Sequence, residues 1–283
     1  MTSAAATREF EFTLADFGRV RELIRGRAGI ALASSKQEMV YSRLSRRLRE
    51  RGMNSFSRYL AELDDPASAE WEPFTNALTT NLTSFFREAH HFPILAEHAR
   101  RVWRDRPLRV WCCAASTGEE PYSIAITLME AAGAGTPAAH IVATDLDTEV
   151  LATARAGVYD ASRVEHLEES RLRQFFLRGT GAAAGKVRVR PEVAALVRFG
   201  PLNLLAPQWP DLRPFDVIFC RNVMIYFDKA TQLQVLRRFV PLLHPDGLLF
   251  AGHSETFFQA ADIFRLRGHT VYQPVPGAAG RAA

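Results

Sequence analysis

Apolar side chains recur through the first eighty residues at the three- and four-residue spacing of amphipathic helices. Val40, Leu44 and Leu48, for example, fall on one face of a single helix. Thr13 and Asp16 have the pattern of a capping box at the start of the first helix. The spacing predicts helices over about residues 13–27, 35–51, 55–63 and 70–80. This part of the chain is therefore expected to form an all-helical domain.

Later in the chain the pattern changes, and short apolar runs alternate with helical stretches. Buried strands are predicted over residues 110–114, 141–143, 197–199, 215–220 and 248–251. Helices are predicted over residues 121–132, 148–156 and 231–243, and a hairpin over residues 264–272. Strands that alternate with helices are typical of right-handed βαβ units and a mostly parallel sheet. The fold class predicted for this part is therefore α/β.

One segment interrupts this alternation. Residues 175–181 and 186–190 have the pattern of two short strands around a turn rich in glycine and alanine. We interpret the segment over about residues 174–200 as a small antiparallel β-subdomain inserted into the α/β domain. The tail, residues 276–283, is dominated by glycine and alanine, and we expect it to be disordered.

The composition is that of an ordinary globular chain. Of 283 residues, 47% are apolar and 23% are charged, and no apolar run approaches the length of a membrane span. The N-terminus has neither the basic opening nor the long apolar stretch of a signal peptide. Three cysteines cannot form a full set of disulfides, and no Cys/His spacing resembles a zinc site. These features predict a cytoplasmic protein with no metal and no membrane span.

The chain is basic, with a net charge of +4 and an isoelectric point of about 9.2. Such a charge favours an anionic partner, but it does not distinguish nucleic acid from an acidic membrane surface or a glutamate-rich protein. The predicted helix over 35–51 concentrates part of the charge, because Lys36, Arg43 and Arg47 fall on one face and Arg46, Arg49 and Arg51 add to it. Within that helix only Glu38 and Glu50 oppose them.

An acidic residue follows the second predicted strand, and ligands of open α/β sheets bind beyond the carboxyl ends of the strands. Asp145 has the position and the chemistry to accept hydrogen bonds from the hydroxyl groups of a ribose. The alternative is that Asp145 caps the next helix. Asp147 fits that cap better, because Thr148 and Glu149 then open the helix. Spacing alone leaves both roles of Asp145 open.

The loop after the first predicted strand carries acidic residues rather than a run of glycines. Its single glycine, Gly118, does not make the dinucleotide fingerprint, and the chain has no P-loop. Glu119 and Glu120 would repel a pyrophosphate, whereas they suit a cationic group such as the ammonium of methionine. The alternative is that they only stabilise the helix N-terminus, by roughly 0.3–1 kcal/mol. The first possibility favours S-adenosylmethionine over a dinucleotide.

A polar motif lies where the helical part of the chain meets the sheet part. Asn81, Thr83 and Arg87 interrupt an otherwise apolar segment. They indicate either a capped helix start or one wall of a ligand pocket, and their spacing does not decide between the two.

Three motifs taken together resemble the CheR family of chemotaxis methyltransferases. They are residues 79–88, TTNLTSFFRE, residues 116–123, STGEEPYS, and residues 219–227, FCRNVMIYF. Residues 252–255, GHSE, also match, and the resemblance extends over about residues 10–275. Three long motifs in the same order are a highly specific signal, whereas any one of them alone is not.

The resemblance implies a fold, domain boundaries and an activity. The expected fold is a Rossmann-like class I methyltransferase domain with the small antiparallel β-subdomain, preceded by an all-helical N-terminal domain. The expected boundaries are 1–88 for the helical, substrate-recognition domain and 89–275 for the domain that binds S-adenosylmethionine. The implied reaction transfers a methyl group to glutamate side chains of methyl-accepting chemotaxis receptors and leaves S-adenosylhomocysteine.

The resemblance also implies roles for individual residues. The S-adenosylmethionine pocket is expected to contain Asn81, Thr83, Arg87, Glu119, Glu120, Asp145, Asn203, Leu204, Arg221 and Asn222. Of the acidic pair, Glu120 is preferred for the methionine end, and Asp145 is expected to hold the ribose hydroxyls. Arg87 and Tyr226 are expected near the reacting methyl group as the catalytic residues.

The implied partner is a receptor whose methylated segments are acidic helices. Lys36, Arg43, Arg46 and Arg47 are the candidates for docking such a helix, and the alternative is a solvated helix face. In some members of the family the β-subdomain tethers a receptor's C-terminal tail by strand addition, and residues 175–190 are the candidates for that role here. We expect a monomer that associates at most with membrane arrays of receptors.

Two other functions compete with this one. A nucleic-acid methyltransferase would explain the basic charge, but residues 221–224, RNVM, are not the Asn-Pro-Pro-aromatic sequence that grips a flipped base. No run interleaves exposed aromatic and basic residues as single-strand binders do, so nucleic acid is not an expected partner. The second alternative is a non-catalytic sensor of S-adenosylmethionine, which the sequence leaves open.

Overall fold

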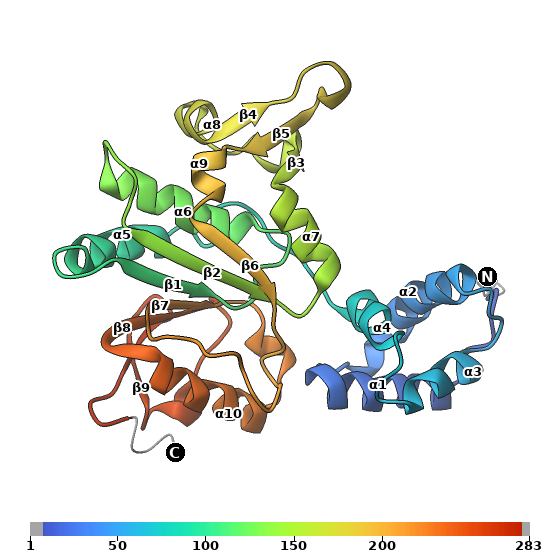
Figure 1. Cartoon of the computed structure of the whole chain (residues 1–283). Coiled ribbons are helices and arrows are strands. Elements are labelled where there is room, and N and C mark those ends of the chain that lie inside the picture. Colours follow the sequence, from blue (N-terminus) through green and yellow to red (C-terminus); the bar gives the residue numbers. More distant parts are fainter. Residues whose placement is uncertain (1–7, 279–283) are drawn as a thin grey trace, which may run out of the picture. The chain divides into compact units, whose positions relative to one another are not determined.

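The computed structural model describes residues 8–278, and the chain divides into two compact units, residues 1–80 and 81–283 (Figure 1). This division comes earlier than the boundary predicted after residue 88. The reason is that the segment after Thr80 packs into the second unit. Phe85 and Phe86 belong to the same buried cluster as the strands of the main sheet.

The first unit is helical, as predicted. Its helices are α1 (Leu14–Ala28), α2 (Gln37–Glu50), α3 (Phe56–Ala61) and α4 (Trp71–Leu78), with 3-10 turns η1 (Ser34–Lys36) and η2 (Glu62–Asp64). Thr13 and Asp16 form the predicted capping box at the start of α1. Val40, Leu44 and Leu48 are fully buried, so the face of α2 predicted to pack is the face that packs.

The second unit is built on a seven-stranded sheet. Its strands are β1 (Leu108–Cys112), β2 (Ala139–Asp145), β6 (Val197–Pro201), β7 (Phe215–Cys220), β8 (Leu243–Ala251), β9 (Phe264–Gly268) and β10 (Val271–Pro274). Their order is β6-β2-β1-β7-β8-β10-β9. The first five strands run parallel, and β10 pairs antiparallel with β8 and β9. The predicted α/β fold with a final hairpin is therefore confirmed.

Helices cover both faces of this sheet. α5 (His91–Val102), α6 (Glu119–Ala132) and α7 (Thr148–Ala156) contribute to one buried cluster, and α10 (Lys229–Phe239) contributes to the other. Neighbouring residues of a strand serve opposite faces, as Val110 and Trp111 of β1 do. The sequence pattern did not predict α5, because two of its buried positions are the histidines His91 and His98.

A separate antiparallel sheet has three strands in the order β3-β5-β4. They are β3 (Val158–Asp160), β4 (Phe176–Arg178) and β5 (Lys186–Val189). The hairpin predicted from the sequence is present as β4 and β5. The pattern did not predict β3, because three residues are too few to show an alternation. The small sheet therefore begins before residue 174, and the chain is back in the main sheet at Val197.

Short elements complete the second unit. They are α8 (Glu169–Phe175), α9 (Pro191–Ala194), η3 (Ala161–Arg163), η4 (Gly181–Ala183), η5 (Met224–Tyr226), η6 (Val240–Leu242) and η7 (Phe258–Ala260). Of the tail predicted to be disordered, residues 279–283 lie outside the described residues, and Ala278 is buried. Within residues 8–278, no helix combines the length and the apolar character that a membrane crossing requires. All three cysteines are free and buried.

Candidate functional site

Asp145 lies at the carboxyl end of β2, next to β1, where the order of the strands reverses. Its Oδ2 accepts the backbone N–H of Ser116 at 2.7 Å, and its Oδ1 accepts that of Asp147 at 3.0 Å. Burial raises the pKa of Asp145, and these two donors oppose the shift. Because each carboxylate oxygen has a second lone pair, the fixed carboxylate can also accept hydrogen bonds from a vicinal diol.

Asp147, and not Asp145, caps the helix that follows. Its Oδ1 accepts the N–H groups of Glu149 at 2.9 Å and Val150 at 3.2 Å, at the start of α7. Asp145 therefore does not serve as the cap. Asn81 comes to the same place, because its Nδ2 donates a hydrogen bond to Asp147 at 2.8 Å.

The two acidic residues at the start of α6 point to different partners. Glu119 is fully buried, accepts a hydrogen bond from the Thr117 hydroxyl at 2.6 Å and pairs with Arg163. Glu120 is also buried, and it pairs with Arg221 at 2.5 Å. Burial raises the pKa of Glu120, and the guanidinium of Arg221 opposes this shift. The acidic pair is therefore split between two sides of the loop.

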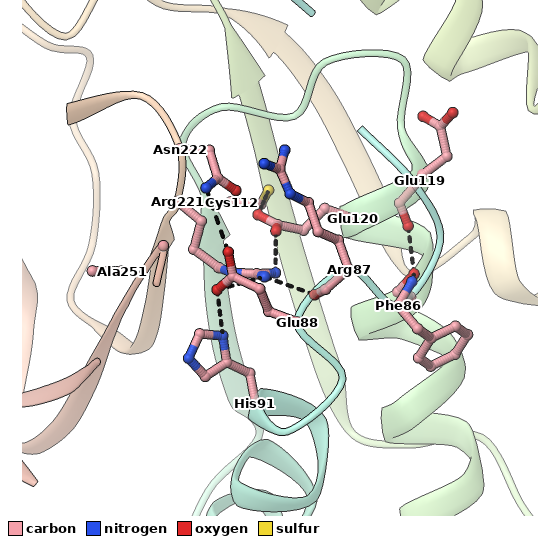
Figure 2. A network of polar contacts seen from close by, with 12 residues as sticks. Phe86, Arg87, Glu88, His91, Cys112, Glu119, Glu120, Arg221, Asn222 and Ala251 are labelled. Atoms are coloured by element: carbon pink, nitrogen blue, oxygen red, sulfur yellow. Dashed lines mark hydrogen bonds and ion pairs between the residues drawn. The ribbon is translucent and has the colours of Figure 1, made fainter. Parts of the chain in front are cut away.

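Arg221, directly after β7, is the centre of a buried polar network (Figure 2). Its Nη1 contacts Glu120, and its Nη2 lies 3.1 Å from Glu88 and donates to the backbone carbonyl of Arg87 at 2.6 Å. Asn222 donates from its Nδ2 to Glu88 at 3.4 Å. The predicted cofactor residue Arg221 thus holds other residues of the site together.

The segment after Asn81 lines the same edge of the sheet. Arg87 is half-buried as a residue, and its Nη1 donates to the Leu82 carbonyl at 2.8 Å. The carbonyl of Thr83 accepts a hydrogen bond from Arg163 at 3.2 Å. Tyr226 is half-buried and packs against the cluster beneath the post-β7 loop. The motif at 81–87 is thus a loop, and the alternative of a helix start is wrong.

Asn203 and Leu204 follow β6, the neighbour of β2. The Asn203 side chain accepts the N–H of Leu205 at 2.8 Å, which closes a tight turn. Leu204 is buried, and its carbonyl accepts a hydrogen bond from Arg238 at 3.2 Å. The turn is held next to β2, because the N–H group of Leu202 donates to the Asp145 carbonyl at 2.9 Å.

The four candidate docking residues, Lys36 at the end of η1 and Arg43, Arg46 and Arg47 of α2, belong to the helical unit, and the three arginines have partners within it. Arg43 donates to the carbonyl of Thr79 at 2.5 Å. Arg47 pairs with the buried Glu70 through two nitrogens: Nη2 donates to the carboxylate oxygens at 2.8 and 3.0 Å, and Nε donates to one of them at 3.0 Å. Arg46 is 79% exposed, and Lys36 is also exposed. Glu70 lies twenty residues beyond the end of α2, so a count of the acidic residues within that helix did not include it.

Three polar residues of the site were not predicted: Glu88, Arg163 and Glu255. Glu88 and Glu255 each stood inside a matching motif, so the motif was the signal that could have indicated them. Glu255 is buried and accepts the N–H groups of Gly252 at 2.6 Å and Asn222 at 2.9 Å. Arg163 lies between Ser162 and Val164 outside the matching motifs, and nothing in its sequence context marks it.

A doubly wound sheet, a carboxylate after its second strand and acidic residues in place of a phosphate-binding loop fit the class of S-adenosylmethionine-dependent methyltransferases. Family profiles agree with this class. The profile "CheR methyltransferase, SAM binding domain" matches residues 81–273, and "CheR methyltransferase, all-alpha domain" matches residues 15–79. The chain belongs to the CheR family of methyltransferases.

Curated relatives are similar over nearly their whole length. The chain is 61% identical to the chemotaxis protein methyltransferase of Klebsiella aerogenes, over 91% of this chain and 89% of the relative. It is 58% identical to that of Salmonella typhimurium, over 94% of this chain and 92% of the relative. It is 57% identical to that of Escherichia coli, over 91% and 90%.

Proposed function

We propose that this protein transfers a methyl group from S-adenosylmethionine to glutamate side chains of methyl-accepting chemotaxis receptors. One observation carries the proposal. Asp145 and Glu120 lie at the edge of the sheet where a cofactor binds in this fold, and the loop that carries Arg87 lies at the same edge. The relatives' name, chemotaxis protein methyltransferase, supports the receptor as the methyl acceptor.

The donor groups at the sheet edge fit S-adenosylmethionine. Asp145 is held by two backbone N–H groups and still has lone pairs for the two ribose hydroxyls. Glu120 supplies negative charge for the ammonium of the methionine end. The remaining residues that we assign to the pocket are Asn81, Thr83, Arg87, Glu119, Asn203, Leu204, Arg221 and Asn222. None of these pocket residues is assigned as a metal ligand.

The chemistry asks little of the protein beyond alignment. When bound, the sulfonium of S-adenosylmethionine supplies an already activated methyl group. A glutamate has an ordinary pKa of about 4.3 and is already an anion near neutral pH, so no strong general base is needed. Arg87 can orient that carboxylate through a bidentate contact. Tyr226 donates a hydrogen bond or packs the site, and both side chains exclude water from the reacting atoms.

The helical unit, together with Lys36, Arg43, Arg46 and Arg47 of its α2 face, is proposed to recognise an acidic receptor helix. Exposed charge supports Lys36 and Arg46 most directly. Arg43 and Arg47 contribute to the positive potential, although contacts within the unit hold their guanidinium groups. Recognition by charge is expected to weaken as ionic strength rises.

The small antiparallel sheet is proposed to tether a receptor's C-terminal tail by strand addition. β3 and β4 are the two edges of that sheet, and each presents a partly exposed apolar residue, Val158 at 40% and Leu177 at 39%. A tether raises the effective concentration of the acceptor without changing the chemistry. Calorimetry with a tail peptide tests this part, and no heat of binding would remove it. The proposal further places a monomer in the cytoplasm, at the receptor arrays, in keeping with three free, buried thiols.

The decisive experiment measures transfer of radiolabelled methyl from S-adenosylmethionine to membranes that carry chemoreceptors, followed by mild base. Methyl esters hydrolyse and release volatile methanol, whereas N-methyl and nucleobase methyl groups are stable. Base-labile label on receptor protein is the expected result. Base-stable label would indicate another acceptor, and label on added nucleic acid would favour a nucleic-acid methyltransferase. Cofactor binding with no label on several receptors would indicate a sensor.

A further inference from the structure

The backbone on both sides of Arg87 is in the left-handed region. Phe86 has φ 54° and Glu88 has φ 55°, and neither residue is a glycine. Such a conformation costs of order 1 kcal/mol or more at each residue, and it persists only where the surroundings hold it. The loop that carries Arg87 is therefore held in place by its contacts, and not by its own preference.

Side chains from two directions hold this loop. The Ser123 hydroxyl of α6 accepts the N–H of Phe86 at 2.9 Å. The Arg221 guanidinium, after β7, donates to the Arg87 carbonyl at 2.6 Å. His166 contacts the Phe85 carbonyl at 3.1 Å. The Arg221 contact is the one that reaches Arg87 itself, so the position of Arg221 decides how Arg87 is presented.

Glu88 is one of the three groups that contact the Arg221 guanidinium, with Glu120 and the Arg87 carbonyl. Its side chain is 10% exposed, and a carboxylate oxygen lies 3.1 Å from Nη2 of Arg221, a contact that is drawn in Figure 2. It also accepts a hydrogen bond from Asn222, and His253 lies 3.6 Å away on the loop after β8. One carboxylate thus joins the Arg87 loop to the loops that follow β7 and β8.

Glu88 is the second carboxylate on Arg221, besides Glu120 at 2.5 Å. Burying a charge is unfavourable unless its contacts repay the loss of hydration. In the proposed function the ammonium of the cofactor balances one of the two carboxylates, so charge alone permits Glu88 at this place. The geometry gives Glu88 a further role, because it meets Arg221 at Nη2, the same nitrogen that donates to the Arg87 carbonyl.

We propose that Glu88 is a positioning residue for methyl transfer, which acts through Arg221 on the backbone of Arg87. The inference rests on the proposed function, in which Arg87 orients the acceptor carboxylate. Glu88 does not need to touch either substrate. Its loss is expected to misplace Arg87 while the contacts of Asp145 and Glu120 with the cofactor remain.

The test is Glu88→Gln, which keeps the shape of the side chain and removes its charge. We expect kcat to fall by roughly 10- to 100-fold, the effect of a displacement of about 1 Å of a group that aligns the reaction. The dissociation constant of S-adenosylmethionine, measured by calorimetry, is expected to change by a smaller factor than kcat, because Asp145 and Glu120 stay in place and Arg87 is the pocket residue that moves.

The matched control is Asp216→Asn. Asp216 lies near the start of β7, the strand that Arg221 directly follows. Asp216 is buried and pairs with Arg106 at 2.6 Å, so it reproduces the loss of a buried, paired carboxylate. Its carboxylate accepts hydrogen bonds from Arg106 and from the backbone N–H of Arg109, at the end of the sheet away from the carboxyl edge. Its variant is expected to lose stability but to keep kcat. Equal losses of kcat in the two variants would overturn the proposal.

A double-mutant cycle with Arg87→Lys separates positioning from general damage. If Glu88 acts through Arg87, Glu88→Gln lowers kcat much less in the Arg87→Lys background than in the wild type. Independent, multiplicative effects would overturn the inference. Should Glu88→Gln fail to fold, Glu88→Asp withdraws the carboxylate by one methylene and keeps its charge, and wild-type kcat in that variant would contradict the proposal.

The outcomes also separate this inference from the proposed function. An impaired Arg87→Lys together with an unimpaired Glu88→Gln would overturn only the positioning role. Full activity in Arg87→Lys would remove the role of Arg87 in the proposed function, and with it the reason for positioning by Glu88. Absence of base-labile label in the wild type would reject the receptor reaction itself.

Discussion

Two arginine clusters, one in each unit, use similar ion pairs in different ways. In the helical unit, Arg47 pairs with Glu70 and joins α2 to the start of α4, and the hydroxyl of Tyr59 also donates to Glu70 at 2.9 Å. Both helices there keep regular backbone. In the second unit, Arg221 has two carboxylates and a backbone carbonyl as partners.

The difference lies in what each cluster stabilises. Around Arg221, the non-glycine residues Phe86, Glu88 and Asn222 have positive φ, and so does Ser116 on the neighbouring loop. No residue of positive φ other than glycine is found among the described residues of the helical unit. The Arg47 cluster therefore adds stability to elements that would form without it, whereas the Arg221 cluster maintains a loop geometry that needs support. We expect the same substitution to affect mainly stability in one cluster and mainly function in the other.

Arg221→Met should have the largest effect. It leaves Glu88 and Glu120 buried without their partner, and breaking a buried ion pair by removing one member costs about 3–5 kcal/mol. Urea unfolding measures this loss, and calorimetry with S-adenosylmethionine is expected to show weakened binding as well. Arg221→Lys keeps a charge but not the planar fork, so it is expected to recover part of the stability and little of the turnover. Wild-type kcat in Arg221→Lys would contradict the importance of the fork.

Glu70→Gln is the corresponding change in the helical unit. It removes the charge that Arg47 and Tyr59 face, and we expect the unfolding free energy to fall by about 1–3 kcal/mol. The affinity for S-adenosylmethionine, measured by calorimetry, should not change, because Glu70 belongs to the other compact unit. If this variant weakened cofactor binding as much as the Arg221 variants do, the contrast between the two clusters would be lost.

The charge of Arg221 also has a consequence for pH. Burial, and after it the positive charge of Arg221, lowers the pKa of His91 to about 4. The ordinary pKa of histidine in an unfolded chain is about 6.5. Between that pH and about 4, this histidine is therefore protonated in the unfolded state and neutral in the folded state. His91 therefore contributes stability above about pH 6.5 that is lost as the pH falls towards 4.

The expected loss through His91 is about 2 kcal/mol between neutral pH and about pH 5. Urea unfolding at the two pH values, compared between the wild type and His91→Gln, isolates this contribution from other titrating groups. His140→Gln, on an exposed position of β2, is the control and should follow the wild type. An unchanged pH dependence in His91→Gln would show that His91 is not held neutral.

The sequence was most informative where structure is decided locally. The capping box at Thr13, the cap at Asp147 and the apolar run of β7 depend on neighbouring residues, and each was predicted. The motifs likewise indicated the loops that meet at the carboxyl edge of the sheet. The boundary between the units was less accessible, because it depends on Phe85 and Phe86 packing with strands that come later in the chain.

Contacts between distant residues could not be predicted from spacing. Arg221 and Arg87 are 134 positions apart, and the meaning of Glu88 depends on that contact. The buried face of α5 includes His91 and His98. Because histidine counts as a polar residue, the spacing of apolar residues did not indicate this face. In the helical unit, the same limitation concealed the pairing of Arg47 with Glu70, so Lys36, Arg43, Arg46 and Arg47 looked equally available from the sequence.

The structure therefore ranks the basic residues of α2, and Arg46→Ala tests that ranking with the smallest expected effect. Arg46 is 79% exposed and its pair with Glu50 is a surface pair, so its removal should change stability by less than about 0.5 kcal/mol. If it meets an acidic receptor helix, the KM for receptor should rise by about 2- to 5-fold at low salt, with kcat unchanged, and the difference should disappear as salt screens the charges. Initial rates with receptor-bearing membranes measure both. Arg58→Ala, an exposed arginine on α3 of the same unit, is the matched control. Equal KM values for the two variants at every salt concentration would mean that net charge, and not the α2 face, captures the receptor.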